Sequence, residues 1–144
     1  AEERAFNEIA DLRARITAEI ERRDLPAAAS LYQELQVKSP SHCLSEQQQL
    51  EVGREFYRAA RFPEAAAVFD RFVQCYPSSS EAGNVRLLLG IIFARELRQY
   101  EDADKHLTYC LPSLRDTVRR DQCLEWLKNV REALGRPAPE LGTG

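Results

Sequence analysis

The chain has 144 residues, of which 44% are hydrophobic and 30% charged, as in a globular protein with one core. Its formal net charge of −3 argues against a nucleic-acid-binding module, because such modules are usually basic. The longest apolar run, residues 87–94, is shorter than the roughly 18 residues that a membrane-spanning helix requires. We therefore expect no nucleic-acid partner and no insertion of this chain into a membrane.

The predicted elements are all helices, and local signals set their ends. Ser45 and Ser78 each precede a Gln or Glu by three residues, which is the capping-box pattern of a helix start. Pro26 and Pro63 stand at the start of further helices, and Gly135 is a natural stop. In chain order, the predicted helices span residues 3–22, 25–38, 46–60, 63–75, 79–98, 101–111 and 114–134.

A repeat of 37–38 residues relates these helices to one another. The set Leu25, Ala28, Tyr32 and Leu35 recurs 37 residues on as Phe62, Ala65, Phe69 and Phe72, and 38 residues later as Tyr100, Ala103, Leu107 and Cys110. Gly53 and Gly90 are also 37 residues apart. Self-similarity at this period indicates stacked helical hairpins. The third copy has one extra residue between Gly90 and Tyr100, which predicts a longer turn between its helices.

The middle copy resembles the tetratricopeptide repeat (TPR), whose signature is L-G-x-x-Y, then A-x-x-x-F, then P. The positions assigned to this repeat framework are Gly53, Phe56, Ala65, Phe69, Pro77, Gly90, Phe93 and Ala103. The resemblance implies an all-α, right-handed solenoid of three helix-turn-helix hairpins with a C-terminal capping helix. We expect one domain over 1–135, with repeats at about 9–42, 46–79 and 83–112, a capping helix at 114–134 and a disordered tail at 136–144.

Two segments carry further resemblances to bacterial proteins. Residues 69–79 are similar to the F-x-x-F-x-x-x-Y-P-x-S string of envelope repeat proteins, such as outer-membrane assembly lipoproteins and cell-division coordinators. Residues 47–50 and 88–95 are similar to repeat segments attached to rhomboid-type membrane proteases. Both resemblances imply a bacterial interaction module.

The TPR resemblance implies that a ligand lies on a concave face lined by the first helix of each hairpin. The exposed first-helix positions are predicted to be Arg13, Thr17, Arg54, Tyr57, Arg58, Asn84, Leu87, Ile91 and Arg95. Arg54 and Arg58 are one helical turn apart, and Arg and Tyr are favoured interface anchors. We therefore predict a basic groove for an acidic or C-terminal peptide. The alternative is that these arginines are solvated or paired with Glu51, Glu55 or Glu96.

No constellation indicates catalysis, a metal or a cofactor. His42 and Cys43 are adjacent in a linker without a third group, and Asp102-x-Asp104-x-His106 places at most two ligands on one helix face. We expect the latter to be a solvated charged face. The four cysteines contain no Cys-x-x-Cys pair and are expected to be small buried thiols in a reducing compartment.

We therefore predict a non-catalytic protein–protein interaction module that binds a peptide or helix of another protein. Two alternatives stay open: a regulatory or targeting domain of a larger enzyme such as a bacterial membrane protease, and a self-assembling scaffold that forms a homo-oligomer. The predicted location is cytoplasmic, or at the cytoplasmic face of a membrane if the chain is a fragment, with a periplasmic location as the alternative.

Overall fold

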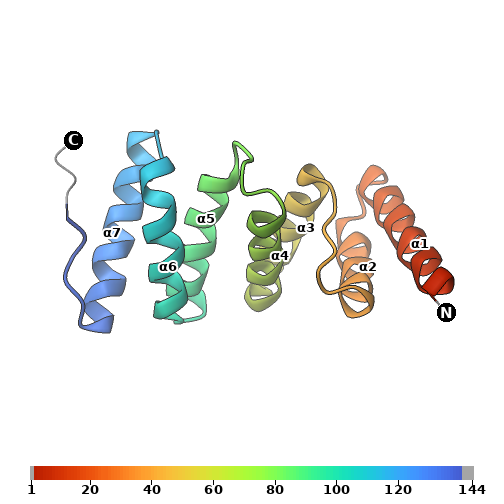
Figure 1. The fold of residues 1–144 in the computed structure, drawn as a ribbon, viewed down its shortest axis with the longest axis horizontal. Coiled ribbons are helices and arrows are strands. Elements are labelled where there is room, and N and C mark those ends of the chain that lie inside the picture. Colours follow the sequence, from red (N-terminus) through yellow and green to blue (C-terminus); the bar gives the residue numbers. More distant parts are fainter. Residues whose placement is uncertain (1, 141–144) are drawn as a thin grey trace. The chain divides into compact units, whose positions relative to one another are not determined.

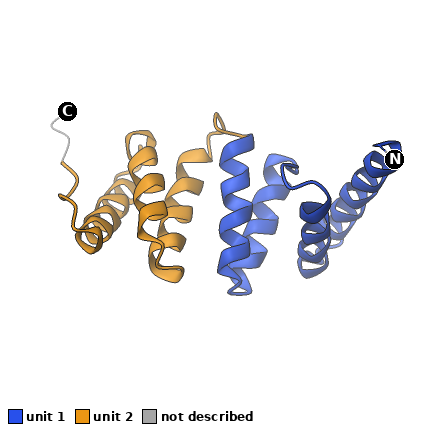
Figure 2. Ribbon diagram, turned by 60° about the horizontal axis from the view of Figure 1, so that its bottom comes forward, with its two compact units in different colours: residues 1–75 blue, residues 76–144 orange. Residues whose placement is uncertain are grey.

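The computed structural model describes residues 2–140, and within this range it contains helices and loops but no strand. It divides into two compact units, unit 1 at residues 1–75 and unit 2 at residues 76–144 (Figure 2). The predicted all-α, TPR-like repeat fold is confirmed.

Unit 1 consists of two helical hairpins. In the first, α1 packs against α2, and in the second, α3 packs against α4; α2 also contacts α3 (Figure 1). The helices are α1 (Glu2–Glu21), α2 (Leu25–Lys38), α3 (Glu46–Arg58) and α4 (Phe62–Cys75).

The starts of α2 and α3 follow from their capping side chains. The Asp24 carboxylate accepts a hydrogen bond from the Ala27 amide at 3.2 Å, and Ser45 Oγ accepts one from the Gln48 amide at 3.3 Å. The reciprocal bond of the predicted capping box, from the Ser45 amide to Gln48, does not form, and the Gln48 side chain donates to Thr17 Oγ1 at 3.0 Å. This bond ties the start of α3 to α1.

Close approach of the paired helices explains the repeat glycines. A Cβ atom on Gly53 would lie 2.6 Å from Cε1 of Phe69, and one on Gly90 would lie 2.6 Å from Cγ of Leu107. Any side chain at either position would therefore collide with the facing helix of its own hairpin. Among the assigned framework positions, Phe93 is half-buried and Pro77 exposed, while the others are buried: Gly53, Phe56, Ala65, Phe69, Gly90 and Ala103.

One buried polar side chain, Gln49, links three parts of unit 1. Its Oε1 accepts from the Leu44 amide at 3.0 Å, and its Nε2 donates to the Val68 carbonyl at 3.0 Å and to Tyr32 Oη at 2.9 Å. Burial raises the pKa of Tyr32 to about 12, against the lowering effect of the bond from Gln49. Every polar atom of the Gln49 side chain thus has a partner inside the protein.

Unit 2 is a hairpin covered by one further helix. The α5 helix packs against α6, and α7 contacts both of them. Together they enclose a core that includes Leu87, Ile91, Leu107 and Leu127, with Trp126 packed at its edge. The elements are α5 (Ala82–Ile91), the π-helical turn η1 (Ile92–Glu96), α6 (Tyr100–Cys110), the 3₁₀ turn η2 (Leu111–Ser113) and α7 (Thr117–Leu134).

The extra residue of the third repeat lies inside a helix, and the predicted longer turn does not form. The Leu97 amide bonds to the Ile92 carbonyl at 3.1 Å, a step of five residues that defines a π-helical turn. The turn that follows resembles the other two, because Arg23, Ala60 and Arg98 all adopt positive φ angles, of 64°, 59° and 53°. The helix absorbs the insertion and leaves the connection unchanged.

The predicted start of a helix at residue 79 is also wrong. Residues 78–81 form a turn in which the Ala82 amide bonds to the Ser79 carbonyl at 3.0 Å and Ser79 Oγ accepts from the Glu81 amide at 3.1 Å. These short-range bonds replace the capping box predicted for Ser78, and α5 starts only at Ala82 without a side-chain cap.

The segment after α7 begins with a left-handed Gly135 (φ 69°) that ends the helix as predicted. Arg136 then pairs with Glu101 at 2.7 Å and with Asp104 at 2.7 Å. Of the tail predicted to be disordered, residues 136–140 have no regular secondary structure, and residues 141–144 lie outside the described residues.

Candidate functional site

Five of the predicted groove residues belong to unit 1. Arg13, Arg54 and Arg58 are exposed, whereas Thr17 and Tyr57 are half-buried. Arg58 Nε donates to Glu55 at 3.0 Å, and a second bond from the same guanidinium makes the pair bidentate. For Arg58, the structure therefore confirms the alternative that the arginine is paired with a neighbouring glutamate.

The other four predicted residues belong to unit 2, and two of them are misplaced. Leu87 and Ile91 were expected to be exposed, but they are only 4% and 6% exposed. The reason is α7, which lays Cys123 and Leu127 against this face of α5 in the same core cluster. Asn84 is half-buried, and Arg95 is exposed with its Nε 2.7 Å from Glu96.

A polar pocket of about 580 Å³ opens in unit 2, and Asn84 lies on its wall. We call it the unit 2 pocket. Residues of α5 and the turn before it form one side, and residues of α6, η2 and the start of α7 form the other. Its lining consists of Pro77, Ser79, Ser80, Ala82, Gly83, Asn84, Arg86, Tyr109, Ser113, Arg115, Asp116 and Arg119.

The charges that line the unit 2 pocket are mainly positive, with three arginines against one aspartate, although the whole chain carries −3. Asp116 is engaged locally, because it caps α7 through the Val118 amide at 3.1 Å and lies 3.4 Å from Arg119. The uncapped start of α5 adds the partial positive charge of a helix N-terminus. The pocket is therefore suited to a negatively charged group.

Arg86 is held in place at the pocket wall. Its guanidinium stacks over the Tyr109 ring, with Cζ 4.2 Å from the ring centroid, and its Nη1 lies 3.4 Å from Nδ1 of His106. The His106 ring in turn stacks on Phe93 with the centroids 5.6 Å apart. Arg86 thus meets a ligand with little side-chain freedom left to lose.

Asp104 and His106, expected on a solvated helix face, are in fact buried, at 8% and 7% exposed. Burial would raise the pKa of Asp104, but bonds from Arg136, Thr108 and Arg131 hold it below its ordinary value of 3.8. Arg131 Nε lies 3.1 Å and Arg136 Nη1 2.7 Å from this carboxylate. Asp104 is thus a structural link from α6 to α7 and to the segment after it.

The His42–Cys43 pair has no properties of a catalytic nucleophile. Burial, a hydrogen bond with Cys75 and repulsion from it raise the pKa of the Cys43 thiol to about 12. Burial and the charge of Arg13 lower the pKa of His42. A thiol with this pKa is almost entirely protonated at neutral pH. In the described part of the chain, no group of three or more acidic, His or Cys side chains is arranged to hold a metal ion.

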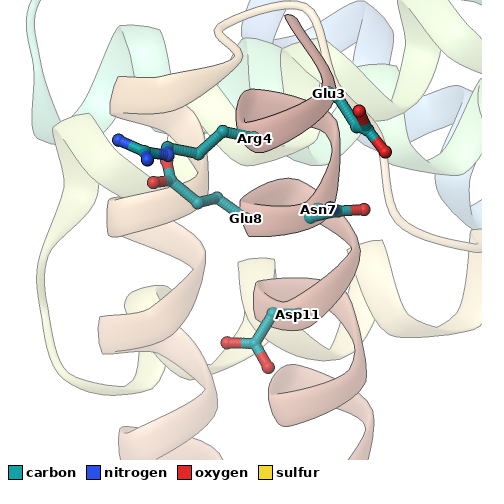
Figure 3. Close-up of a pocket in the computed structure, with 5 residues that line it drawn as sticks. All are labelled: Glu3, Arg4, Asn7, Glu8 and Asp11. Carbon is teal, nitrogen blue, oxygen red and sulfur yellow. The ribbon is translucent and has the colours of Figure 1, made fainter. Parts of the chain in front are cut away.

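A second hollow of about 580 Å³ is formed by α1 alone (Figure 3). Its residues are Glu3, Arg4, Asn7, Glu8 and Asp11, and Figure 3 shows the guanidinium of Arg4 beside the carboxylate of Glu8. Side chains of one helix give such a hollow no opposing wall, so we interpret it as a solvated charged face. The unit 2 pocket, built from three helices, is the candidate site.

The residues that give the unit 2 pocket its charge were not among those predicted. Arg86, Arg115 and Arg119 do not occupy the ligand-facing register of a TPR first helix. The usable sequence signal was the group of arginines at 115, 119 and 120, at the start of the capping helix.

Comparison with known families gives a match to the model described as YfiO, outer membrane lipoprotein, over residues 8–134. No curated protein and no solved structure gives a match. None of the described helices is long and apolar enough to cross a membrane. The predicted cytoplasmic location is wrong, because an outer membrane lipoprotein lies in the bacterial envelope. Since the match covers nearly the whole sequence, the chain belongs to the YfiO family of outer membrane lipoproteins.

Proposed function

We propose that this protein is a non-catalytic adaptor of the envelope whose unit 2 pocket binds an acidic segment of a partner protein in outer membrane assembly. The family supports a protein-interaction role. The observation that carries the finer proposal is the convergence of Arg86, Arg115 and Arg119 on one pocket of an otherwise acidic chain.

The three arginines differ in how strongly other residues of the protein hold them. Arg86 is oriented by Tyr109, whereas Arg115 is exposed and makes no ion pair with any residue the structure describes. Arg119 has only a 3.4 Å contact to Asp116. A ligand carboxylate therefore finds guanidinium donors that do not have to break strong internal bonds, and a hydrogen bond between charged groups contributes about 1.5–3 kcal/mol.

The size of the unit 2 pocket limits the ligand. A volume of about 580 Å³ is in the range of small-ligand sites, about 300–1,000 Å³. It accommodates a few side chains and not a folded domain. The bound element is therefore a short peptide segment with acidic residues.

The test uses a fluorescein-labelled, end-blocked peptide of eight residues rich in Glu and a Gln counterpart, with binding measured by fluorescence anisotropy. We expect only the Glu peptide to bind and its Kd to rise with salt. The variant Arg115→Glu/Arg119→Glu should weaken binding at least tenfold. Arg4→Glu/Arg15→Glu makes the same charge change on α1 of unit 1 and serves as the matched control, with unchanged Kd.

Two results would overturn the proposal. One is equal affinity for the Glu and Gln peptides, which would remove charge as the basis of recognition. The other is equal weakening in both charge-reversal variants, which would show an effect of net charge and not of the pocket.

A further inference from the structure

Two cysteines of unit 2 lie side by side in its core. Cys110 is the last residue of α6, Cys123 belongs to α7, and their Sγ atoms are 4.0 Å apart. The two residues are 1% and 0% exposed. Both thiols also approach the same backbone oxygen, that of Leu107, at 3.5 Å and 3.3 Å. The two sulfurs therefore point to a common spot between α6 and α7.

The geometry requires little change for a covalent bond. A disulfide joins sulfurs about 2.05 Å apart, so the Cys110 and Cys123 sulfurs have to approach by about 2 Å. Rotation about the Cα–Cβ bonds of the two residues moves the sulfurs over a distance of this size. The other two cysteines, Cys43 and Cys75, belong to unit 1, so each thiol of unit 2 has one candidate partner in its own unit.

The location of the protein in the envelope favours disulfide formation. The sequence predicts buried thiols in a reducing compartment, whereas the family places the protein in the envelope, where disulfides form and persist. We propose that Cys110 and Cys123 are joined by a disulfide bond in the mature protein.

The oxidant is a protein disulfide of the envelope that takes part in thiol–disulfide exchange. One cysteine thiolate attacks this disulfide to give a mixed disulfide and releases one thiol of the donor. The second cysteine then displaces the other donor sulfur and forms the S–S bond within unit 2. The two cysteines lose two electrons and two protons in total, and the donor gains them as two thiols.

The bond forms during folding, before α7 closes over the core. In the folded unit, both cysteines are buried, at 1% and 0% exposed, so the disulfide of an oxidising protein cannot reach either sulfur. The same burial afterwards protects the disulfide from reductants.

The disulfide closes the segment from 110 to 123, which carries four residues of the unit 2 pocket: Ser113, Arg115, Asp116 and Arg119. Tethering this segment to α6 restricts the unfolded chain and fixes one wall of the pocket. The formation of the bond is independent of what the pocket binds. Its effect on peptide affinity depends on the proposed function.

The test uses the variant Cys43→Ala/Cys75→Ala, which leaves one pair of cysteines, exported to a bacterial periplasm and harvested in an alkylating agent. After denaturation without reductant, we expect no alkylated thiol and a mass about 2 Da below that of the reduced protein. Reduction should lower the thermal midpoint by roughly 5–10 °C. A further Cys123→Ala change should give one alkylated thiol and no shift on reduction.

The unaltered chain supplies a measurement that does not depend on the folding of any variant. Trypsin should release peptides 106–115 and 121–128 linked to each other, and reductant should separate them. Two alkylated thiols in the exported Cys43→Ala/Cys75→Ala protein, or unlinked peptides from the unaltered chain, would overturn the proposal. If the disulfide forms but the Glu-rich peptide does not bind, the proposed function fails and this inference stands.

Discussion

Replacing Gln49 by Leu tests whether a buried amide holds unit 1 together. Leu is similar in volume, so the change removes the hydrogen bonds with little loss of packing. Three bonds disappear: one from the Leu44 amide, one to the Val68 carbonyl and one to Tyr32 Oη. The Leu44 amide bears the largest loss, because this residue is only 1% exposed and water cannot reach it readily.

The magnitude follows from these contacts. Three net hydrogen bonds contribute about 3 kcal/mol, and the loss of this bond at the buried Leu44 amide costs about 1–3 kcal/mol more. Burying the leucine side chain returns about 1–2 kcal/mol. The Val68 carbonyl lies inside α4, and Tyr32 Oη still accepts from Gln36 at 2.7 Å, so neither is orphaned. We expect the free energy of unfolding to fall by about 2–5 kcal/mol.

The assay is urea unfolding followed by circular dichroism, with Gln47→Leu as the matched control. Gln47 lies on the same helix but is exposed, so its replacement should change stability by less than about 0.5 kcal/mol. A Gln49→Leu variant as stable as the control would show that the buried amide network does not stabilise unit 1.

Three further predictions concern stability. Gly90→Val should lower the free energy of unfolding by about 2 kcal/mol, because a Cβ there lies 2.6 Å from Leu107 Cγ; an unchanged urea midpoint would contradict this. Ala60→Gly should raise it by up to about 1 kcal/mol by relieving the positive φ of 59°, and a loss of stability would count against strain at this turn. Asp104→Asn should destabilise the protein at neutral pH. Because the pKa of Asp104 is lowered in the folded state, the ionised carboxylate stabilises the protein above pH 3.8, and this stabilisation is lost as the pH falls further. The free energies of unfolding of the variant and the unaltered protein should therefore converge below pH 3.8. A difference that stays constant with pH would contradict this.

Local and repeat-level signals predicted the fold well because each depends on contacts within one hairpin. Ser45 caps α3 through its own first turn, and Gly53 meets Phe69 within the same pair of helices. Residue types that recur every 37 residues indicate the contacts that each hairpin repeats. The π-helical turn at Ile92–Glu96 could not be located in this way, because the sequence shows that a residue is inserted but not which element takes it up.

The candidate site was harder to predict because it depends on α7, which lies outside the repeat. The prediction from the repeat register assumed that the first helices of all hairpins are equally exposed. In the structure, α7 covers the face of α5 that carries Leu87 and Ile91. The same helix brings Arg119 to the pocket opposite Asn84. Neither effect has a counterpart in unit 1, so the repeat spacing of the sequence could not predict them.

The position of a bound acidic peptide on the protein tests the proposed binding site most directly. A Glu-rich peptide that carries a benzophenone group is irradiated with the protein, and the cross-linked residues are identified by mass spectrometry. We predict cross-links around the unit 2 pocket, at Tyr109 and at the segment that carries Arg115 and Arg119, and their loss in high salt. Cross-links concentrated on the α3 face around Arg54 and Tyr57, with none in unit 2, would contradict it.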